Sequence, residues 1–162
     1  MSTWAEVTYE TPELAARVRA IFDASKHKTM ATLRKDGSPR ISGTEANFYG
    51  SDIFVGSMYG AVKARDLQRD PRVALHSATV DTELTNGDAK ISGRAAEITN
   101  PDEIAAFARA NTESTGQEPP GEFHLFRIDV SEIVLTRIGD PPDHLVIEVW
   151  RAGRGTERIE RR

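Results

Sequence analysis

The chain has 162 residues, 38% of them hydrophobic, which is enough for one domain with a hydrophobic core but not for two large ones. A net charge of −4 argues against a nucleic-acid partner, because nucleic-acid-binding proteins normally carry a basic excess. The absence of cysteine excludes disulfides, thiolate zinc sites and a cysteine nucleophile. No apolar run approaches the roughly 18 residues of a membrane span, and the N-terminus lacks a signal-peptide pattern. We therefore expect a cytoplasmic protein without a membrane partner.

The N-terminal pattern predicts a helix over residues 12–26. Thr11 is the expected N-cap, Pro12 occupies the first helical position, and Glu13 faces the positive end of the helix dipole. Asn100 followed by Pro101 and an acidic turn predicts a second helix start, with Ile104, Phe107 and Ala108 directed inward.

Between and after these helices, short apolar or alternating runs predict strands separated by turns such as Asp36-Gly37 and Asn86-Gly87. Gly93 is the expected site of a β-bulge. The predicted strands are Met30–Arg34, Arg40–Thr44, Ile53–Ser57, Arg72–Ser77, Ala89–Ile98, His124–Asp129, Ile133–Ile138, Leu145–Arg151 and Thr156–Glu160. Many strands with few helices and short turns indicate a mainly β fold, an antiparallel barrel or a sandwich. We expect one domain over 1–162, with the barrel over 29–138 and a C-terminal hairpin over 145–160.

The segment from Ser57 to Pro71 combines a strand end, a loop with small residues and a helix start with Lys63 in its first turn. This arrangement is typical of a phosphate site, because a hydroxyl, backbone N–H groups and a cation converge on the helix N-terminus. The alternative is a solvated helix whose Lys and Arg side chains face water. The segment taken alone does not separate the two interpretations.

Two motifs in order carry a family resemblance. The first is Ala31-Thr32-Leu33-(x)2-Asp36-Gly37-x-Pro39, and the second is Lys63-x-Arg65-x-Leu67-(x)2-Asp70-Pro71-Arg72-Val73. Their spacing and the strands between them resemble the pyridoxamine 5′-phosphate oxidase-like split β-barrel family over about residues 12–138. The resemblance implies a homodimer of antiparallel split barrels of roughly six to eight strands, with peripheral helices and a cofactor groove at the dimer interface.

The resemblance also implies a cofactor, FMN in most members. Lys63-Ala64-Arg65-Asp66-Leu67 is similar to the Lys-x-Arg-Asn-Leu pattern of the flavin and deazaflavin oxidoreductases, which use coenzyme F420. We therefore expect coenzyme F420 or FMN. Ala61 stands where deazaflavin relatives carry a second cation, so the phosphate site is either weaker or completed by Arg40 or by a partner-chain arginine.

Site roles follow from the matching positions. Lys63 is expected to contact the cofactor phosphate, and Arg65 either assists it or forms a structural salt bridge. Ser57 and Met58 would supply neutral donors. The strand with Arg40, Ile41, Ser42 and Gly43 would line the ring edge, although Ser42 is equally explained as a solvent-facing strand serine. Trp150 is more readily explained as a core or interface anchor than as a substrate contact.

Other chemistries lack support in the sequence. The four histidines show no metal-ligand spacing, no serine has the surroundings of a hydrolase nucleophile, and no GxGxxG motif is present. No catalytic residue is assigned, and Tyr59 is named only as a candidate proton donor. The leading hypothesis is an oxidoreductase that transfers hydride to a small planar or conjugated substrate. The alternatives are a non-catalytic protein that binds or stores a flavin, deazaflavin or tetrapyrrole, and a structural dimer with a degenerate site.

Overall fold

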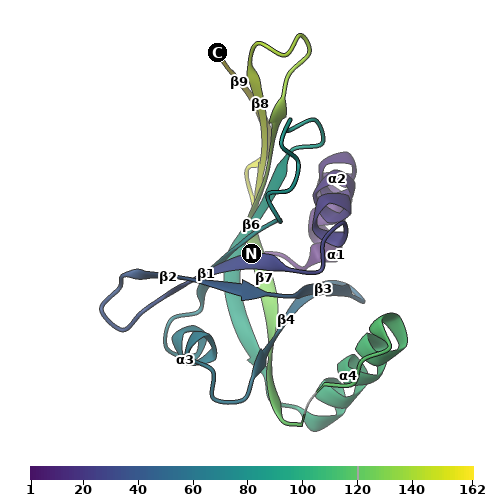
Figure 1. Cartoon of the computed structure of the whole chain (residues 1–162), viewed down its shortest axis with the longest axis vertical. Coiled ribbons are helices and arrows are strands. Elements are labelled where there is room, and N and C mark those ends of the chain that lie inside the picture. The colour runs from purple at the N-terminus through teal and green to yellow at the C-terminus, as the bar shows by residue number, and fades with distance from the viewer. Residues whose placement is uncertain (120) are drawn as a thin grey trace.

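An antiparallel barrel with peripheral helices forms the body of the computed structural model, which describes residues 1–119 and 121–162 (Figure 1). Pro120, in the predicted loop 115–121, lies outside the described residues. The helices are α1 (Trp4–Glu10), α2 (Pro12–Asp23), α3 (Val62–Arg69) and α4 (Pro101–Thr115). The strands are β1 (Lys28–Leu33), β2 (Pro39–Thr44), β3 (Ala46–Tyr49), β4 (Asp52–Met58), β5 (Arg72–His76), β6 (Asp88–Ile98), β7 (Phe123–Ile138), β8 (Leu145–Arg151) and β9 (Gly155–Arg161).

The sheet closes on itself because its two ends belong to one bent strand. The strand order is β2-β1-β5-β6-β7-β4-β3, and β2 and β3 are separated only by Glu45. The expected mainly β fold with an antiparallel barrel is thus confirmed. If β2 and β3 are counted as one bent strand, the barrel has six strands: β1, β2–β3, β4, β5, β6 and β7. Counted separately and with β8 and β9, the described sheet has nine strands. Strand β3 was not predicted from the sequence.

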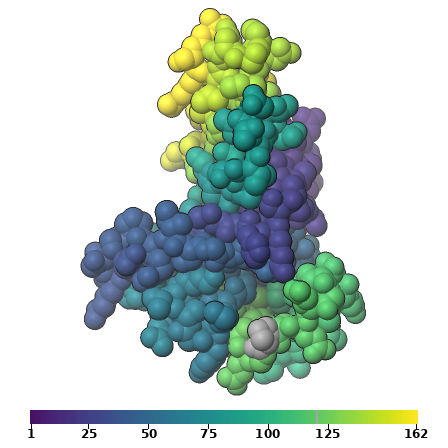
Figure 2. Space-filling model, in the orientation of Figure 1, coloured from purple at the N-terminus to yellow at the C-terminus, as the bar shows by residue number. Residues whose placement is uncertain are grey.

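Strand β7 is one 16-residue strand, so the prediction of two strands over 124–129 and 133–138 is wrong. The register between β6 and β7 shifts after Ser92, leaving Ser131 as the additional residue of a bulge. The expected bulge therefore lies beside Gly93. A Cβ at Gly93 would lie against the Asp129 carbonyl oxygen, which explains the glycine. The second half of β7 carries the β8–β9 hairpin, which projects from the barrel (Figures 1 and 2).

The N-terminus contains a helix that the sequence analysis did not include. Helix α1 has a capping box in which Thr3 and Glu6 satisfy each other's backbone N–H groups. Helix α2 begins at Pro12, as expected, but ends at Asp23 and not at Lys26. Thr11 makes no side-chain capping bond, contrary to expectation, because its hydroxyl lies 3.1 Å from the hydroxyl of Thr156 on β9.

Helices α1 and α2 cover the barrel core, and α4 lies outside it at the edge of the molecule (Figures 1 and 2). Core side chains with essentially no exposure include Val7, Val18, Phe22, Met30, Ile53, Val55, Ile91, Ile128, Ile133 and Trp150. Asn100 caps α4 as expected, accepting from the backbone of Asp102 and Glu103. Phe107 attaches α4 to the barrel, with its ring centroid 5.4 Å from that of Phe54. Within residues 1–119 and 121–162, no helix combines the length and apolar character of a membrane span.

Candidate functional site

A cavity of about 390 Å³ lies between the outer face of the barrel and α4. We call it the outer groove. Strand alternation turns Gly43 of β2 and Gly56 of β4 toward it, since the neighbouring Thr44 and Val55 are buried in the barrel. A Cβ added to either glycine would meet no atom within 4 Å. The opposite wall comes from α4, including Phe107, and from the loop after it. Because Gly43 and Gly56 have no side chain, a flat ligand can approach the backbone on their side of the groove.

Lys63 lies at one end of the outer groove. Its Nζ atom donates a 2.7 Å hydrogen bond to the Gly43 carbonyl, which joins α3 to β2. Burial lowers the pKa of the Lys63 amine below its ordinary value. The N-cap residue of α3, Ala61, offers no side-chain acceptor to the first-turn N–H groups. Lys63 and the N-terminus of α3 thus lie at the same end of the groove, which suits an anionic ligand.

The structure brings together some, but not all, of the predicted site residues. Gly43, Ser57, Met58 and Lys63 all line the outer groove, whereas Arg40, Ser42 and Arg65 do not. The Ser57 side chain follows the alternation of Ile53 and Val55 and so belongs to the interior face of the barrel. Its hydroxyl is buried and has no hydrogen-bond partner among the described residues.

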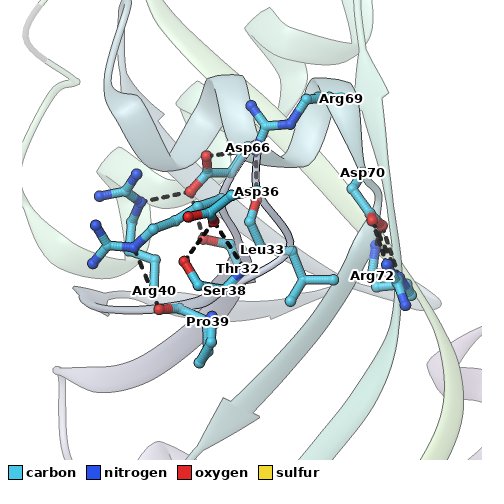
Figure 3. Close-up of polar contacts among 11 residues, drawn as sticks. Thr32, Leu33, Asp36, Ser38, Pro39, Arg40, Asp66, Arg69, Asp70 and Arg72 are labelled. Carbon is cyan, nitrogen blue, oxygen red and sulfur yellow. Dashed lines mark hydrogen bonds and ion pairs between the residues drawn. The ribbon is translucent and has the colours of Figure 1, made fainter.

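Arg40 is held by a buried carboxylate and not by the groove (Figure 3). Its Nε donates to Asp66 Oδ2 at 2.6 Å, while Arg69 and Thr32 donate to the same carboxylate at 2.9 and 3.0 Å. Burial of Asp66 would raise the pKa of its carboxyl, but these three donors outweigh burial and lower it. Asp66 therefore fastens α3 to the β1–β2 hairpin.

Arg65 and Ser42 lie nearby but outside the groove. Arg65 is exposed, and its Nη2 is 3.8 Å from where a Cβ of Gly60 would stand, so the guanidinium lies against the turn before α3. Among the described residues it forms no salt bridge, contrary to the structural alternative. Ser42 is half-buried and pairs with Met30 in the β1–β2 register.

A histidine that was not predicted as a site residue holds the turn before α3. The Gly60 N–H donates to His124 Nε2 at 3.1 Å, and His124 Nδ1 lies 2.7 Å from Glu97. The Tyr59 ring stacks on the imidazole with a centroid distance of 5.3 Å and an interplanar angle of 6°. Since Nε2 accepts from Gly60, the proton is on Nδ1 and is donated to Glu97. No local pattern reveals this contact, because His124 follows Gly60 by 64 residues.

Charges around the groove are mixed. Glu45, Glu118 and Glu122 line it together with Lys63. Within the described residues no group of three or more His, Asp or Glu side chains is arranged to hold a metal ion. Trp150 is fully buried and donates its indole N–H to Glu10 at 2.9 Å, so it is a core residue of this chain.

A closed antiparallel barrel, peripheral helices and a ligand-sized groove on the outer face define the chain as a split-barrel protein. The family model of pyridoxamine 5′-phosphate oxidase matches residues 14–137, and the chain belongs to that family. The family and the split-barrel fold expected from the sequence are thereby confirmed.

Solved structures share this fold. HutZ, the heme storage protein from Vibrio cholerae, superposes with a TM-score of 0.63 at 19% identity, covering 78% of this chain and 94% of its own. An F420 reductase gives a TM-score of 0.57 at 18% identity, covering 71% of this chain and 94% of its own. PhzG from Burkholderia lata 383, in complex with tetrahydrophenazine-1-carboxylic acid, gives 0.61 at 13% identity, covering 96% and 91%. At these identities the similarity shows the fold alone. No curated protein matches the sequence.

Proposed function

We propose that the protein is an oxidoreductase that binds coenzyme F420 or FMN in the outer groove and transfers hydride to a small planar or conjugated substrate. The observation that carries the proposal is the groove itself: two outward-facing glycines form an open floor, and Lys63 stands at its end. Membership of the pyridoxamine 5′-phosphate oxidase family and the structural similarity to an F420 reductase support it. When bound, either cofactor supplies the hydride chemistry.

The residues of the chain would then bind, orient and exclude water. Gly43 and Gly56 admit a flat ring against the backbone, and Phe107 covers the groove from α4. Lys63 would exchange its contact with the Gly43 carbonyl for the ligand's phosphate, which gives the half-buried amine a counter-charge. Tyr59 lies in the turn before α3, four residues before Lys63, and is strongly exposed, so it stays a candidate proton donor.

We also propose a homodimer. Four apolar side chains near the groove are strongly exposed: Ile41 at 74%, Met58 at 74%, Tyr59 at 69% and Val62 at 53%. A second copy would cover them. It would also supply positive charge that the groove of one chain lacks, since Lys63 stands there with three glutamates. The predicted assistance from Arg40 is not favoured, because Asp66 already holds that guanidinium.

The experiment is a titration of the purified chain with FMN and with F420, followed by reduction of a quinone and enone panel with each reduced cofactor. We expect binding of one cofactor that is weakened about tenfold in Lys63→Met, or about 1.4 kcal/mol. Lys35→Met is the matched control, because Lys35 lies in the exposed β1–β2 turn. Binding of neither cofactor, or equal binding by Lys63→Met and the control, would contradict the proposed site.

A second candidate is non-catalytic tetrapyrrole binding. The observation that favours it is His27, an exposed imidazole that lines the outer groove and is able to ligate iron. Titration with hemin, monitored through the Soret band, tests this function. A shifted band that is lost in His27→Ala, without turnover of the quinone and enone panel, would favour it over the oxidoreductase.

A further inference from the structure

A second cavity continues the outer groove along α4. It has a volume of about 610 Å³ and lies between the end of α2, strand β3 and α4. We call it the α2–α4 cavity. Five residues line both spaces: Glu45, Asn47, Phe107, Asn111 and Gln117. The two cavities therefore adjoin along these residues.

Charge in the α2–α4 cavity is nearly all paired, with one exception. Arg19 pairs with Asp23 at 3.3 Å, and Lys26 pairs with Glu45 at 3.5 Å. Lys28, at the start of β1, forms no salt bridge among the described residues. The cavity thus contains three cations and two carboxylates, so one positive charge is left over, and it belongs to Lys28.

Lys28 is also the buried member of the set. The residue is only 7% exposed, and its Nζ donates one hydrogen bond, to the Lys26 carbonyl at 3.2 Å. An ammonium group has three donors, so two lack a partner among the described residues. Burial lowers the pKa of this amine, against the opposing effect of Asp23 and Glu45. A buried, under-bonded amine at a cavity wall is stabilised by an anion that enters the cavity.

The walls indicate what kind of anion fits. Phe48, Tyr49 and Phe107 supply aromatic surface, and the Asn111 amide makes no side-chain hydrogen bond among the described residues. Arg19 lies over the Phe48 ring at 5.1 Å, and Asp23 already supplies its counter-charge. A single excess charge among aromatic and amide groups matches a monoanionic carboxylate attached to an unsaturated skeleton better than a dianionic phosphate.

We propose that the α2–α4 cavity binds the carboxylate of an unsaturated organic acid, with Lys28 as the counter-ion, and that this acid reaches into the outer groove. The identification of the acid as the substrate rests on the proposed function. The binding of the acid does not, because Lys28 and the walls around it are present in the chain without any cofactor.

The test compares cinnamate with cinnamamide by isothermal titration on the chain without cofactor, at pH 7 and low salt. We expect cinnamate to bind about tenfold tighter or more, and Lys28→Met to remove this preference while cinnamamide affinity is unchanged. Lys35→Met is the matched control and should retain the preference, because Lys35 is exposed in the β1–β2 turn and lines neither cavity. Equal binding of acid and amide, no binding of either, or a preference that survives Lys28→Met would overturn the proposal.

A second pair of variants tests the location without touching Lys28. Ala110→Trp would fill the α2–α4 cavity from α4 and should abolish cinnamate binding, whereas Ala105→Trp on the exposed side of the helix should not. Heteronuclear NMR of the wild-type lysine side chains adds a direct readout, in which cinnamate shifts the Lys28 signal. An unshifted Lys28 signal at saturating cinnamate contradicts the site. Cinnamate binding without any cofactor binding would leave this proposal standing and refute only the proposed function.

Discussion

The Arg40 guanidinium donates through Nε to Asp66 Oδ2 at 2.6 Å, and this contact joins strand β2 to helix α3. Asp66 is 2% exposed and also accepts from Arg69 and Thr32. Since α3 carries Lys63 and β2 carries Gly43, the carboxylate fixes the distance between two walls of the outer groove. The role of Asp66 is structural, and its loss should change the shape of the outer groove as well as lower the stability of the fold.

Asp66→Asn should lower the free energy of unfolding by about 2 to 3 kcal/mol, because two guanidinium groups lose a buried counter-charge. Urea denaturation monitored by circular dichroism measures this change. Asp70→Asn is the control, since Asp70 pairs with Arg72 at the surface and its loss should change stability little. An equal effect of the two substitutions would show that burial of Asp66 contributes nothing.

The contribution of Asp66 should also depend on pH. The pKa of the Asp66 carboxyl is lowered in the folded chain, so its stabilisation is fully present above the unfolded pKa of about 3.9. It is lost as the pH falls from there through the lower folded value. The difference in unfolding free energy between wild type and Asp66→Asn should therefore be constant near neutral pH and shrink below about pH 4. A difference that shrinks above pH 5 would contradict the assignment.

Gly56→Val should block the outer groove without harming the fold. A Cβ at Gly56 meets no atom within 4 Å, and valine is favoured in strands, so the thermal midpoint should hold or rise. The added side chain would occupy space that a flat ligand needs, and affinity for the bound cofactor should fall about tenfold or more. Paired thermal melts and cofactor titrations check both halves. Unchanged affinity in a folded variant would place the ligand elsewhere.

Gly93→Ala should behave in the opposite way. Its Cβ would lie against the Asp129 carbonyl at the β6–β7 bulge, so the backbone would have to shift to accept it. We expect a loss of about 1 to 3 kcal/mol of unfolding free energy. Gly43→Ala is the control, because no atom lies within 4 Å of its added Cβ. Equal stability of the two alanine variants would mean that the bulge relaxes freely.

Local sequence signals predicted turns and helix caps well, but they could not predict contacts between residues far apart in the sequence. The Asp36-Gly37 turn and the Asn100 cap act through neighbours in sequence and were predicted correctly. The capping box of Thr3 and Glu6 is also a local sequence signal, but α1 is too short to show the hydrophobic periodicity of a helix. The capture of Arg40 by Asp66 joins residues 26 apart and depends on how the barrel closes, so spacing could not reveal it.

His124→Ala should loosen the turn that precedes α3. It removes the acceptor of the Gly60 N–H and the ring on which Tyr59 stacks, and it leaves Glu97 with Gln68 as its side-chain partner. Hydrogen exchange at the Gly60 amide should accelerate, because that N–H would then depend on water alone. Since the turn positions Lys63, cofactor affinity should fall in the same variant. Tyr59→Phe keeps the stacked ring and the Gly60 hydrogen bond, so it should retain slow exchange at Gly60. Slow exchange in His124→Ala would contradict the role of His124, and fast exchange in Tyr59→Phe would show that the Tyr59 hydroxyl also protects the Gly60 amide.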